Sequence, residues 1–577
     1  MMKKLNAKAM HIFSIGAVSS ALALGTGVSV LAEGPGGTPP DMPSGGGGGF
    51  GGGANTTTFD YSGSYSGAVT ADGTEESASG TTYSTSTADQ NAALAENGGT
   101  LTLDNVTLNK SGDDTDGDNC NFYGLNSIAL SVNDGSLLKI SNSTLSADSE
   151  GSNGVFATDG AAAYVYNSTI TTTAGNSRGL DATYGGTIIA DSVTISTQGD
   201  HCASIATDRG GGYISVTNSD LSTAGSGSPI LYSTGDIEVD NVTGTAAGSQ
   251  IAGMEGLNTI IIRNSDLTST LTGKTASDPV ADGVIIYQST SGDAESSTGS
   301  RALFQVENSK LTSAIESGAM IYVTNTTANI VLSSSELNFD SDKAALIYIA
   351  GNDDNGWGTA GSNGGDVIMT LTDETVKGDI IVDTISVLDA YLLNGTTWTG
   401  AASIETNANG STSDSPITLN IDSTSKWVVT EDCTISNLNV ADGGQVVDEN
   451  GKTVTIVANG ETVVTGDSDI TVTVTGSYST TVETSEDNEV STEYIDRSAF
   501  DELFGTSTVF TEVNAESNEP EETAEATAEP AATAAATAET VTETESESSS
   551  TSGSSLIWAV VAAVIAAAAV LITRKKN

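Results

Sequence analysis

This sequence contains few of the residue types on which metal sites, disulfide scaffolds and histidine-dependent catalysis rely. It has three cysteines and two histidines in 577 residues. Cys120, Cys202 and Cys433 lie far apart and form no C-x-x-C or His-Cys pair. This spacing excludes a disulfide framework and a cysteine-ligated zinc site. The other histidine lies within residues 1–32, the predicted signal peptide, so histidine catalysis would rest on His201 alone. His201 is predicted to lie in an exposed turn, where a histidine needs no catalytic role.

Basic residues are also scarce. Nineteen Lys and Arg face 74 Asp and Glu, which gives a formal net charge of −55. Such a charge repels phosphate backbones and anionic membrane surfaces, so the sequence predicts no nucleic-acid partner. It suits a solvated surface protein or one that recruits cations.

Both ends of the chain predict export and anchoring. Residues 1–32 combine a basic start, an apolar run and a small-x-small end, which predicts a secretory signal peptide cleaved after Ala32. Leu556–Ile572 is a run of 17 apolar residues, and it predicts a transmembrane helix over 556–573 with a basic cytoplasmic tail at 574–577. A buried core helix is the alternative. The prediction is a single-pass cell-surface protein whose N-terminal bulk is extracellular.

Composition divides the rest of the chain into segments. The Gly/Pro-rich residues 33–57 read as a linker, and the acidic Ala/Thr/Glu/Ser-rich residues 512–555 read as a disordered stalk. Between these segments the sequence predicts, in chain order, an N-terminal cap or strands (58–97), a parallel β-helix (98–365), an irregular continuation or β-rich cap (366–482) and a C-terminal cap with a short helix (483–511).

A repeat of about 25 residues organises the predicted β-helix. Each unit has a glycine, and six to eight residues later an Asn or Ser opens a phrase such as N-S-T-L. A fixed period of this size is typical of a stacked array in which each unit buries its apolar face against its neighbours. The glycines are Gly135, Gly160, Gly185, Gly210, Gly235 and Gly256, and the markers are Asn142, Asn167, Ser192, Asn218, Asn241 and Asn264.

Within each unit, apolar residues recur two apart, as in Leu138/Ile140 and Ile260/Ile262. This spacing is typical of strands whose alternate side chains point inward, and the columns predict three short strands per unit. We therefore predict an all-β, three-sided parallel β-helix. A helical fold is excluded because no spacing of three and four persists and Thr, Ser, Gly, Val and Ile dominate.

The Asn markers and the irregular gaps between them predict turns and inserted loops. Asn tolerates left-handed turn geometry and can bond from coil to coil, so the N-x-S/T sequences read as a structural ladder rather than as glycosylation sites. Longer gaps predict inserted loops at 111–119, 289–300 and 351–365.

The loop at 111–119 is acidic. Asp114, Asp116 and Asp118 resemble the start of a calcium loop, but the sixth and twelfth positions are Asn119 and Leu125, where an EF-hand needs Gly and Glu. A solvated acidic loop and loose calcium binding both remain open.

Acidic residues on the outward side of the first strand are the catalytic candidates. Asp181 and Asp208 should lie about 8 Å apart, from coil and strand spacings of ~4.8 and ~6.6 Å. That distance falls within the roughly 6.5–9.5 Å of an inverting glycosidase pair. Arg209 and Glu255 share the position before a glycine and are predicted to approach each other across Thr234. The remaining ligand-binding candidates are Asp159, Tyr184, Ser233 and Tyr287.

The three-strand coils with an Asn after the second strand resemble the pectin-lyase-like right-handed β-helix superfamily. Phrases such as A-S-I-A-T-D-R-G-G-G and I-I-Y-Q-S-T-S-G-D-A resemble adhesin-like surface proteins of bacteria and methanogens. The resemblance implies a right-handed coil and a surface location, and it implies no activity. We therefore expect an adhesin-like protein that contacts glycans or extracellular surfaces. A polysaccharide lyase or glycoside hydrolase and a structural surface-layer spacer are the alternatives.

Overall fold

The structure is a computed structural model that describes residues 58–510, apart from 295–299, 354, 411–412 and 414. The described residues all lie in one compact unit. The predicted signal peptide, linker, stalk, transmembrane helix and basic tail lie outside the described residues. Within the described part, no helix is long and apolar enough to span a membrane.

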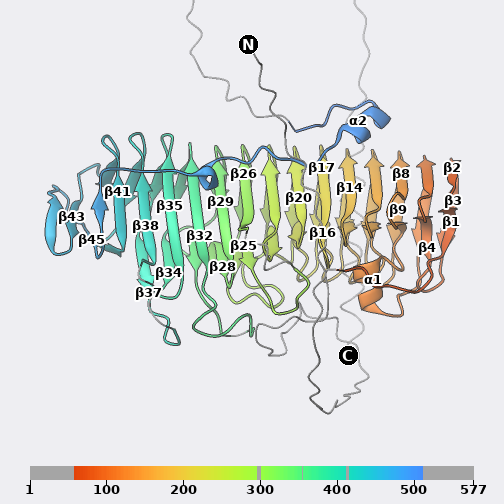
Figure 1. The fold of residues 1–577 in the computed structure, drawn as a ribbon, viewed down its shortest axis with the longest axis horizontal. Helices are drawn as coiled ribbons and strands as arrows, with labels where there is room; N and C mark the ends of the chain where they lie inside the picture. The colour runs from red at the N-terminus through yellow and green to blue at the C-terminus, as the bar shows by residue number, and fades with distance from the viewer. Residues whose placement is uncertain (1–57, 295–299, 354, 411–412, 414, 511–577) are drawn as a thin grey trace, which may run out of the picture. The chain divides into compact units, whose positions relative to one another are not determined.

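Three long parallel sheets form the core of the described part of the chain (Figure 1). Sheet A has 13 strands and starts at β1 (Gly67–Asp72), sheet B has 15 and starts at β2 (Glu75–Ser79), and sheet C has ten and starts at β3 (Thr82–Thr85). Along these sheets each strand pairs with the third strand after it for most of the array, so one coil contributes one strand to each sheet. The predicted all-β solenoid of three-stranded coils is confirmed.

The inward columns predicted from the sequence form one continuous core. Ile188, Ile214 and Ile237 lie in register on neighbouring strands of sheet B, and the column continues through Ile260 and Phe304. All five side chains are fully buried. Burial of one large aliphatic or aromatic side chain stabilises the fold by about 1.5–3 kcal/mol. A single coil cannot bury these side chains by itself, so this stabilisation comes from the stacking of coils.

The Asn markers form the predicted ladder. Asn142, Asn167, Asn218 and Asn241 all have positive φ, between 51° and 56° except for 45° at Asn167. The Asn167 amide donates to Asn142 Oδ1 at 2.7 Å, and the Asn241 amide donates to Asn218 Oδ1 at 2.6 Å. The side chains thus join successive coils at the turn between sheets B and C.

The solenoid extends beyond the most regular repeats in both directions. Its strands begin at Gly67, so the segment 58–97 supplies the first coil as well as β4 (Asn91–Glu96) of the second. Beyond residue 365, sheet A continues to β37 (Ala402–Glu405) and sheet B to β46 (Tyr478–Ser479). Sheet C ends at β30 (Glu336–Asn338), and a four-stranded sheet starting at β33 (Thr375–Lys377) follows.

The longest connections between strands all adjoin sheet A. They follow β6 (Thr107–Lys110), β24 (Asp266–Ser269), β25 (Asp282–Tyr287), β31 (Ala345–Ile349) and β37. The first contains helix α1 (Gly117–Tyr123) and leads to β7 (Ala129–Val132) of sheet A. In repeat proteins, inserted loops gathered on one side often mark the binding face.

Residues 483–510, which we call the C-terminal strap, run back across sheet B instead of covering the end of the solenoid (Figure 1). The strap contains a short 3-10 helix, η1 (Glu486–Asn488), and α2 (Ser498–Phe504). Asn488 donates to Thr370 on β32 (Asp366–Thr372), and the backbone of Ile495 donates to Glu238 on β20 (Asp236–Asp240). The predicted helix therefore forms, and it packs over the N-terminal part of sheet B, where Phe504 stacks on Tyr166 of β11 (Ala162–Tyr166).

Arg497 anchors the strap. Its guanidinium is buried and donates to Ser215 O and Oγ on β17 (Gly212–Thr217), to Ala190 O on β14 (Gly186–Asp191) and to Thr217 Oγ1, all at 2.7–2.9 Å. Next to it, Phe500 packs edge-on against Tyr164 of β11 (Ala162–Tyr166). A single charged side chain thus joins the strap to two neighbouring strands.

Candidate functional site

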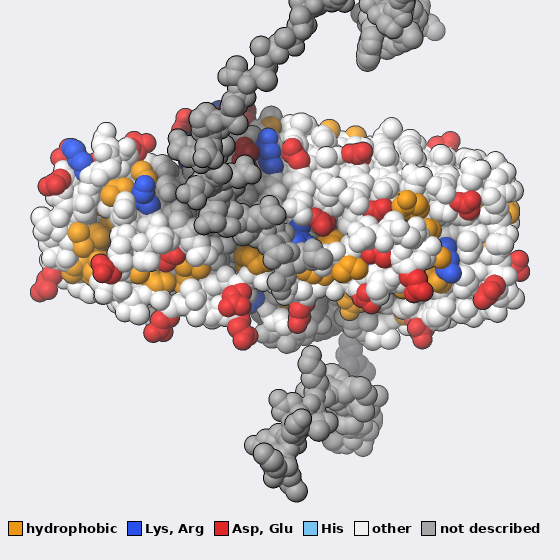
Figure 2. All heavy atoms as spheres, turned by 90° about the horizontal axis from the view of Figure 1, so that it is seen from above, with side chains coloured by type: hydrophobic (Ala, Val, Ile, Leu, Met, Phe, Trp, Pro, Cys, Tyr) orange, Lys and Arg blue, Asp and Glu red, His pale blue; other side chains and the backbone are white. Residues whose placement is uncertain are grey.

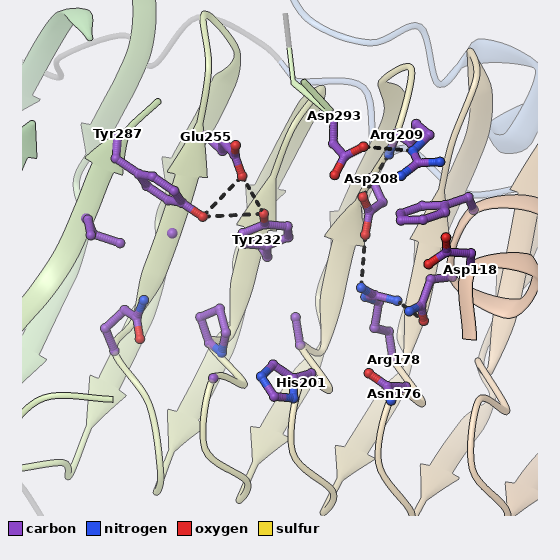
Figure 3. Close-up of a pocket in the computed structure, with 18 residues that line it drawn as sticks. Asp118, Asn176, Arg178, His201, Asp208, Arg209, Tyr232, Glu255, Tyr287 and Asp293 are labelled. Atoms are coloured by element: carbon purple, nitrogen blue, oxygen red, sulfur yellow. Dashed lines mark hydrogen bonds and ion pairs between the residues drawn. The ribbon is translucent and has the colours of Figure 1, made fainter. Parts of the chain in front are cut away.

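Sheet A carries a cavity of about 180 Å³ on its outer face (Figure 3). Strands β16 (Ile205–Thr207), β19 (Leu231–Ser233), β22 (Ala252–Glu255) and β25 lie beneath it, and α1 forms one wall. We call it the sheet A cavity. Its lining consists of Asp118, Asn121, Phe122, Asn176, Arg178, His201, Ala203, Asp208, Arg209, Gly227, Pro229, Tyr232, Gln250, Gly253, Glu255, Ile285, Tyr287 and Asp293.

A buried arginine holds one end of the cavity together. Arg178, which precedes β13 (Leu180–Ala182), is 9% exposed. It donates to Asn121 Oδ1 of α1 at 2.8 Å and to Asp208 Oδ2 at 2.9 Å, and its Nη1 lies 3.4 Å from Asp181 Oδ2. The guanidinium therefore ties the inserted helix to two coils of sheet A.

A second ion pair closes the same end. Arg209 Nε lies 2.7 Å from Asp293 Oδ1, and the guanidinium sits 3.6 Å above the centre of the Phe122 ring. The backbone N–H of Arg209 donates to Asp208 Oδ1 at 2.8 Å. The connection after β25 and the α1 insertion thus meet at Arg209, although they are far apart in sequence.

At the other end lies Glu255, which is 1% exposed. Its Oε2 accepts hydrogen bonds from the hydroxyls of Tyr232 at 3.0 Å and Tyr287 at 3.2 Å. Its Oε1 accepts from the backbone and hydroxyl of Ser289 and from the hydroxyl of Ser291. Figure 3 shows the two tyrosine hydroxyls converging on this carboxylate.

Burial controls the protonation of the acids in this region. Removal from water disfavours the charged form and raises the pKa of Asp208 to about 6, although the neighbouring Arg178 opposes the shift. The pKa of Asp181 is raised, again because of burial against the opposing effect of Arg178. Burial also raises the pKa of Glu255, and hydrogen bonds from Ser289 and Tyr232 oppose it.

The structure corrects the predicted Asp181–Asp208 pair. Asp181 is fully buried rather than solvent-facing, and the Arg178 guanidinium contacts both carboxylates. The space that an inverting pair needs for substrate and water is therefore filled by an arginine. Asp181 is a positioning residue for Arg178, and Asp208 is the member of the pair that lines the cavity.

The predicted approach of Arg209 to Glu255 is also wrong. Gly186 pairs with Gly212, so one extra residue in this coil shifts the register that Gly210 indicated. The ladder pairs Ala206 with Tyr232 and Ser233 with Met254, which places Asp208, Thr234 and Glu255 in one column. Arg209 lies beyond this column and pairs with Asp293 instead.

Three of the four other predicted ligand residues lie elsewhere. Asp159 accepts a hydrogen bond from Asn133 at 3.0 Å in a turn, and Ser233 is fully buried and bonds to the backbone of Gly235 and Thr259. Tyr184 stacks on Tyr123 at 5.6 Å and packs edge-on against Phe59, so its ring is covered. Only Tyr287 lines the cavity.

The acidic loop does not assemble a metal site. Asp116 caps α1, with its Oδ1 accepting from the backbone of Asp118 at 3.1 Å and Asn119 at 3.3 Å. Asp118 lines the cavity, and burial raises the pKa of Asp114. Among the residues that the structure describes, no three His, Cys, Asp or Glu side chains are grouped to hold a metal ion. On the face seen in Figure 2, acidic side chains are dispersed among neutral ones.

Sequence reasoning missed Arg178, Tyr232, Gln250 and Asp293 as parts of the site. One signal was available for Arg178, because arginine is rare in so acidic a chain. Asp293 lies in one of the insertions that adjoin sheet A, and its pairing with Arg209 depends on a loop path that no periodicity specifies.

Comparison of the sequence with protein-family models and with curated proteins gave no match. The class of protein is therefore defined by the structure alone. It is an all-β solenoid of stacked parallel sheets with a polar, partly aromatic cavity on one sheet.

Raised carboxyl pKa values are not confined to the cavity, and they predict the pH dependence of stability. Glu374 is buried, its Oε2 has no hydrogen-bond partner, and burial raises its pKa to about 8 from an unfolded value of about 4.3. The folded state therefore binds the Glu374 proton more tightly than the unfolded state does. The contribution of protonated Glu374 to the free energy of unfolding is complete below about pH 4 and is lost as pH rises through about 8.

We expect Glu374→Gln, which mimics the protonated acid, to match the parent near pH 4 and to unfold at higher temperature than the parent at pH 8.5. Thermal unfolding at the two pH values checks this. A difference between the two proteins that does not change with pH would contradict it.

Proposed function

We propose that this chain is a cell-surface protein of the pectin-lyase-like, right-handed β-helix kind, exported and anchored by 556–573, that binds a glycan in the sheet A cavity. The observation that carries the proposal is the gathering of the longest insertions beside sheet A. Two of them, around α1 and around Asp293, supply walls of the cavity. Inserted loops held on a rigid scaffold are a common location for binding residues.

The lining chemistry supports a sugar ligand. Asn121, Asn176 and Gln250 present amides that can donate to or accept from hydroxyl groups. Tyr232 adds ring surface against which the C–H face of a sugar can pack, whereas the Tyr287 ring stacks on Trp357. Pro229 and Ile285 add apolar surface to the lining, and small-molecule sites typically combine apolar surface with oriented polar groups.

The size of the cavity supports recognition of a single sugar unit. An engineered apolar cavity of about 150 Å³ holds one benzene molecule. A volume of about 180 Å³ therefore suits one six-membered ring. We propose that the cavity takes a terminal residue, with the rest of the glycan outside.

The test is a glycan array probed with cells that display the full chain. We expect Gln250→Ala to weaken binding about tenfold, because loss of a hydrogen bond to ligand costs about 1 kcal/mol or more. Thr194→Ala, an exposed position on β15 (Thr194–Thr197) of sheet C, is the matched control and should bind normally. A blank array, or full binding by Gln250→Ala, would count against the proposal.

A second candidate, glycan cleavage, is favoured by one observation. Asp208 and Glu255 both have raised pKa values, and both line the cavity at positions two coils, or ~9.6 Å, apart. This is near the roughly 6.5–9.5 Å of an inverting pair, with Asp208 as the acid. Incubation with neutral and acidic polysaccharides, with and without calcium, should then give products that Asp208→Asn abolishes. A surface-layer spacer would give neither binding nor products.

A further inference from the structure

The charges that line the sheet A cavity do not cancel. Four lining residues are acidic, and two, Arg178 and Arg209, are basic. Arg178 is held by Asp181 and Asp208, and Arg209 is held by Asp293. Neither guanidinium is left to balance the remaining acids. Of these, Asp118 is exposed to solvent, whereas Glu255 is buried.

Glu255 is surrounded by neutral donors. Its contacts are the hydroxyls of Tyr232, Tyr287, Ser289 and Ser291 and the backbone N–H of Ser289. In the described part of the chain no Lys, Arg or His lies within ion-pair distance of it. Such a shell orients the carboxylate but supplies no positive charge, and a buried carboxylate is stabilised when it meets one.

The two tyrosines that donate to Glu255 also line the cavity. Aromatic rings attract cations through their faces, and Tyr232, Glu255 and Tyr287 lie close together at one end of the site (Figure 3). A cationic group entering here would meet a carboxylate and the ring of Tyr232, because the Tyr287 ring is 1% exposed and stacks on Trp357. An acidic sugar would meet Glu255 with no free arginine to offset the repulsion.

We infer that the sheet A cavity selects a sugar residue with a protonated amine, and that Glu255 is the counter-charge for that amine. The inference rests on the proposed glycan binding and specifies its ligand class. A metal ion fits this end poorly, because calcium takes six to eight oxygen ligands and the described residues offer no group of three metal-binding side chains. An ammonium group needs only one carboxylate and a polar surround.

The experiment compares matched β-1,4-linked tetrasaccharides of glucosamine, N-acetylglucosamine and glucose, with ethanolamine as a sugar-free amine. Each competes for binding to the full chain on cells. We expect glucosamine to bind at least about tenfold more tightly than glucose or N-acetylglucosamine, because charge-assisted hydrogen bonds are roughly twice as strong as neutral ones. Ethanolamine should bind weakly. If ethanolamine binds as well as glucosamine, the amine alone is recognised and the sugar assignment is overturned.

Glu255→Gln keeps the size of the side chain and removes its charge. We expect it to bind glucosamine and glucose about equally. Glu336→Gln, at an exposed position on β30 of sheet C and away from the cavity, is the matched control and should keep the tenfold preference. The net charge of the chain attracts any amine non-specifically, and each variant removes one formal charge, so their difference reports on the cavity.

A measurement on the unaltered chain covers the case in which Glu255→Gln does not fold. Raising the salt concentration should weaken glucosamine binding and leave glucose binding unchanged, because only the former includes an ion pair. Equal affinity for the three tetrasaccharides, or no salt effect, overturns the amine inference. If other glycans on the array bind and these three do not, the amine inference alone fails, whereas a blank array overturns glycan binding itself.

Discussion

Replacing Arg178 with methionine is expected to lower the free energy of unfolding of the cavity region by about 3–5 kcal/mol, the usual cost of removing one partner of a buried ion pair. The change leaves the Asp181 carboxylate fully buried without its cation and removes the bonds to Asp208 and to Asn121 of α1. Denaturant unfolding, together with hydrogen exchange of α1 amides, measures the loss.

Two companion variants separate the buried charge from general damage. Adding Asp181→Asn to Arg178→Met should recover part of the stability, because the orphaned charge is then gone. Lys343→Met removes an exposed cation that pairs with Glu316 and Asp340, and it should leave the unfolding curve unchanged. A loss in Arg178→Met no larger than that in Lys343→Met would show that the network does not hold the site.

Arg497→Ala is expected to release the C-terminal strap. The guanidinium makes four hydrogen bonds to sheet B and one to Thr508, and hydrogen bonds to charged groups contribute about 1.5–3 kcal/mol. A cost of about 3 kcal/mol would raise the undocked fraction of the strap roughly a hundredfold. The amide of Ile495, which donates to Glu238, should then exchange rapidly, and 489–496 should become protease-sensitive.

The core of the solenoid should be little affected by that release, because the buried aliphatic cluster of the sheets contains no residue of the strap. Val509→Ala, at a strap position that is 53% exposed, is the matched control and should leave exchange at Ile495 slow. Continued protection of Ile495 in Arg497→Ala would mean that Phe500 and the backbone contacts hold the strap without the arginine.

The sequence predicted the parts of the fold that repeat. Inward residues two apart and a turn Asn or Ser recur in every regular coil, so Ile214 and Asn218 could be assigned from their periodicity alone. The register of a single coil could not be predicted from periodicity. One extra residue among Gly210, Gly211 and Gly212 moved Asp208 into the column of Glu255, and periodicity averages over such insertions.

The candidate site was predicted in part for the same reason. Asp208, Arg209, Glu255 and Tyr287 were identified because they lie at the outward positions near the ends of strands, which the repeat defines. The residues that contact the site come from insertions and turns outside the repeat. Asp293 forms an ion pair with Arg209, and Asn121 accepts a hydrogen bond from Arg178. Burial of Asp181 also depends on these partners, and the strand pattern alone indicated an exposed residue.

The strap has a mechanical consequence. A pulling force on the chain beyond residue 510 first meets the buried Phe510, which packs with Tyr494, and then Phe500 and Arg497. Arg497 passes it into β14 and β17, the fifth and sixth of the 15 strands of sheet B. The tension therefore does not act on the last coil near β46, where strands could peel away one at a time. It is shared across coils that are hydrogen-bonded on both sides, so the solenoid is loaded from its flank rather than unwound from its end.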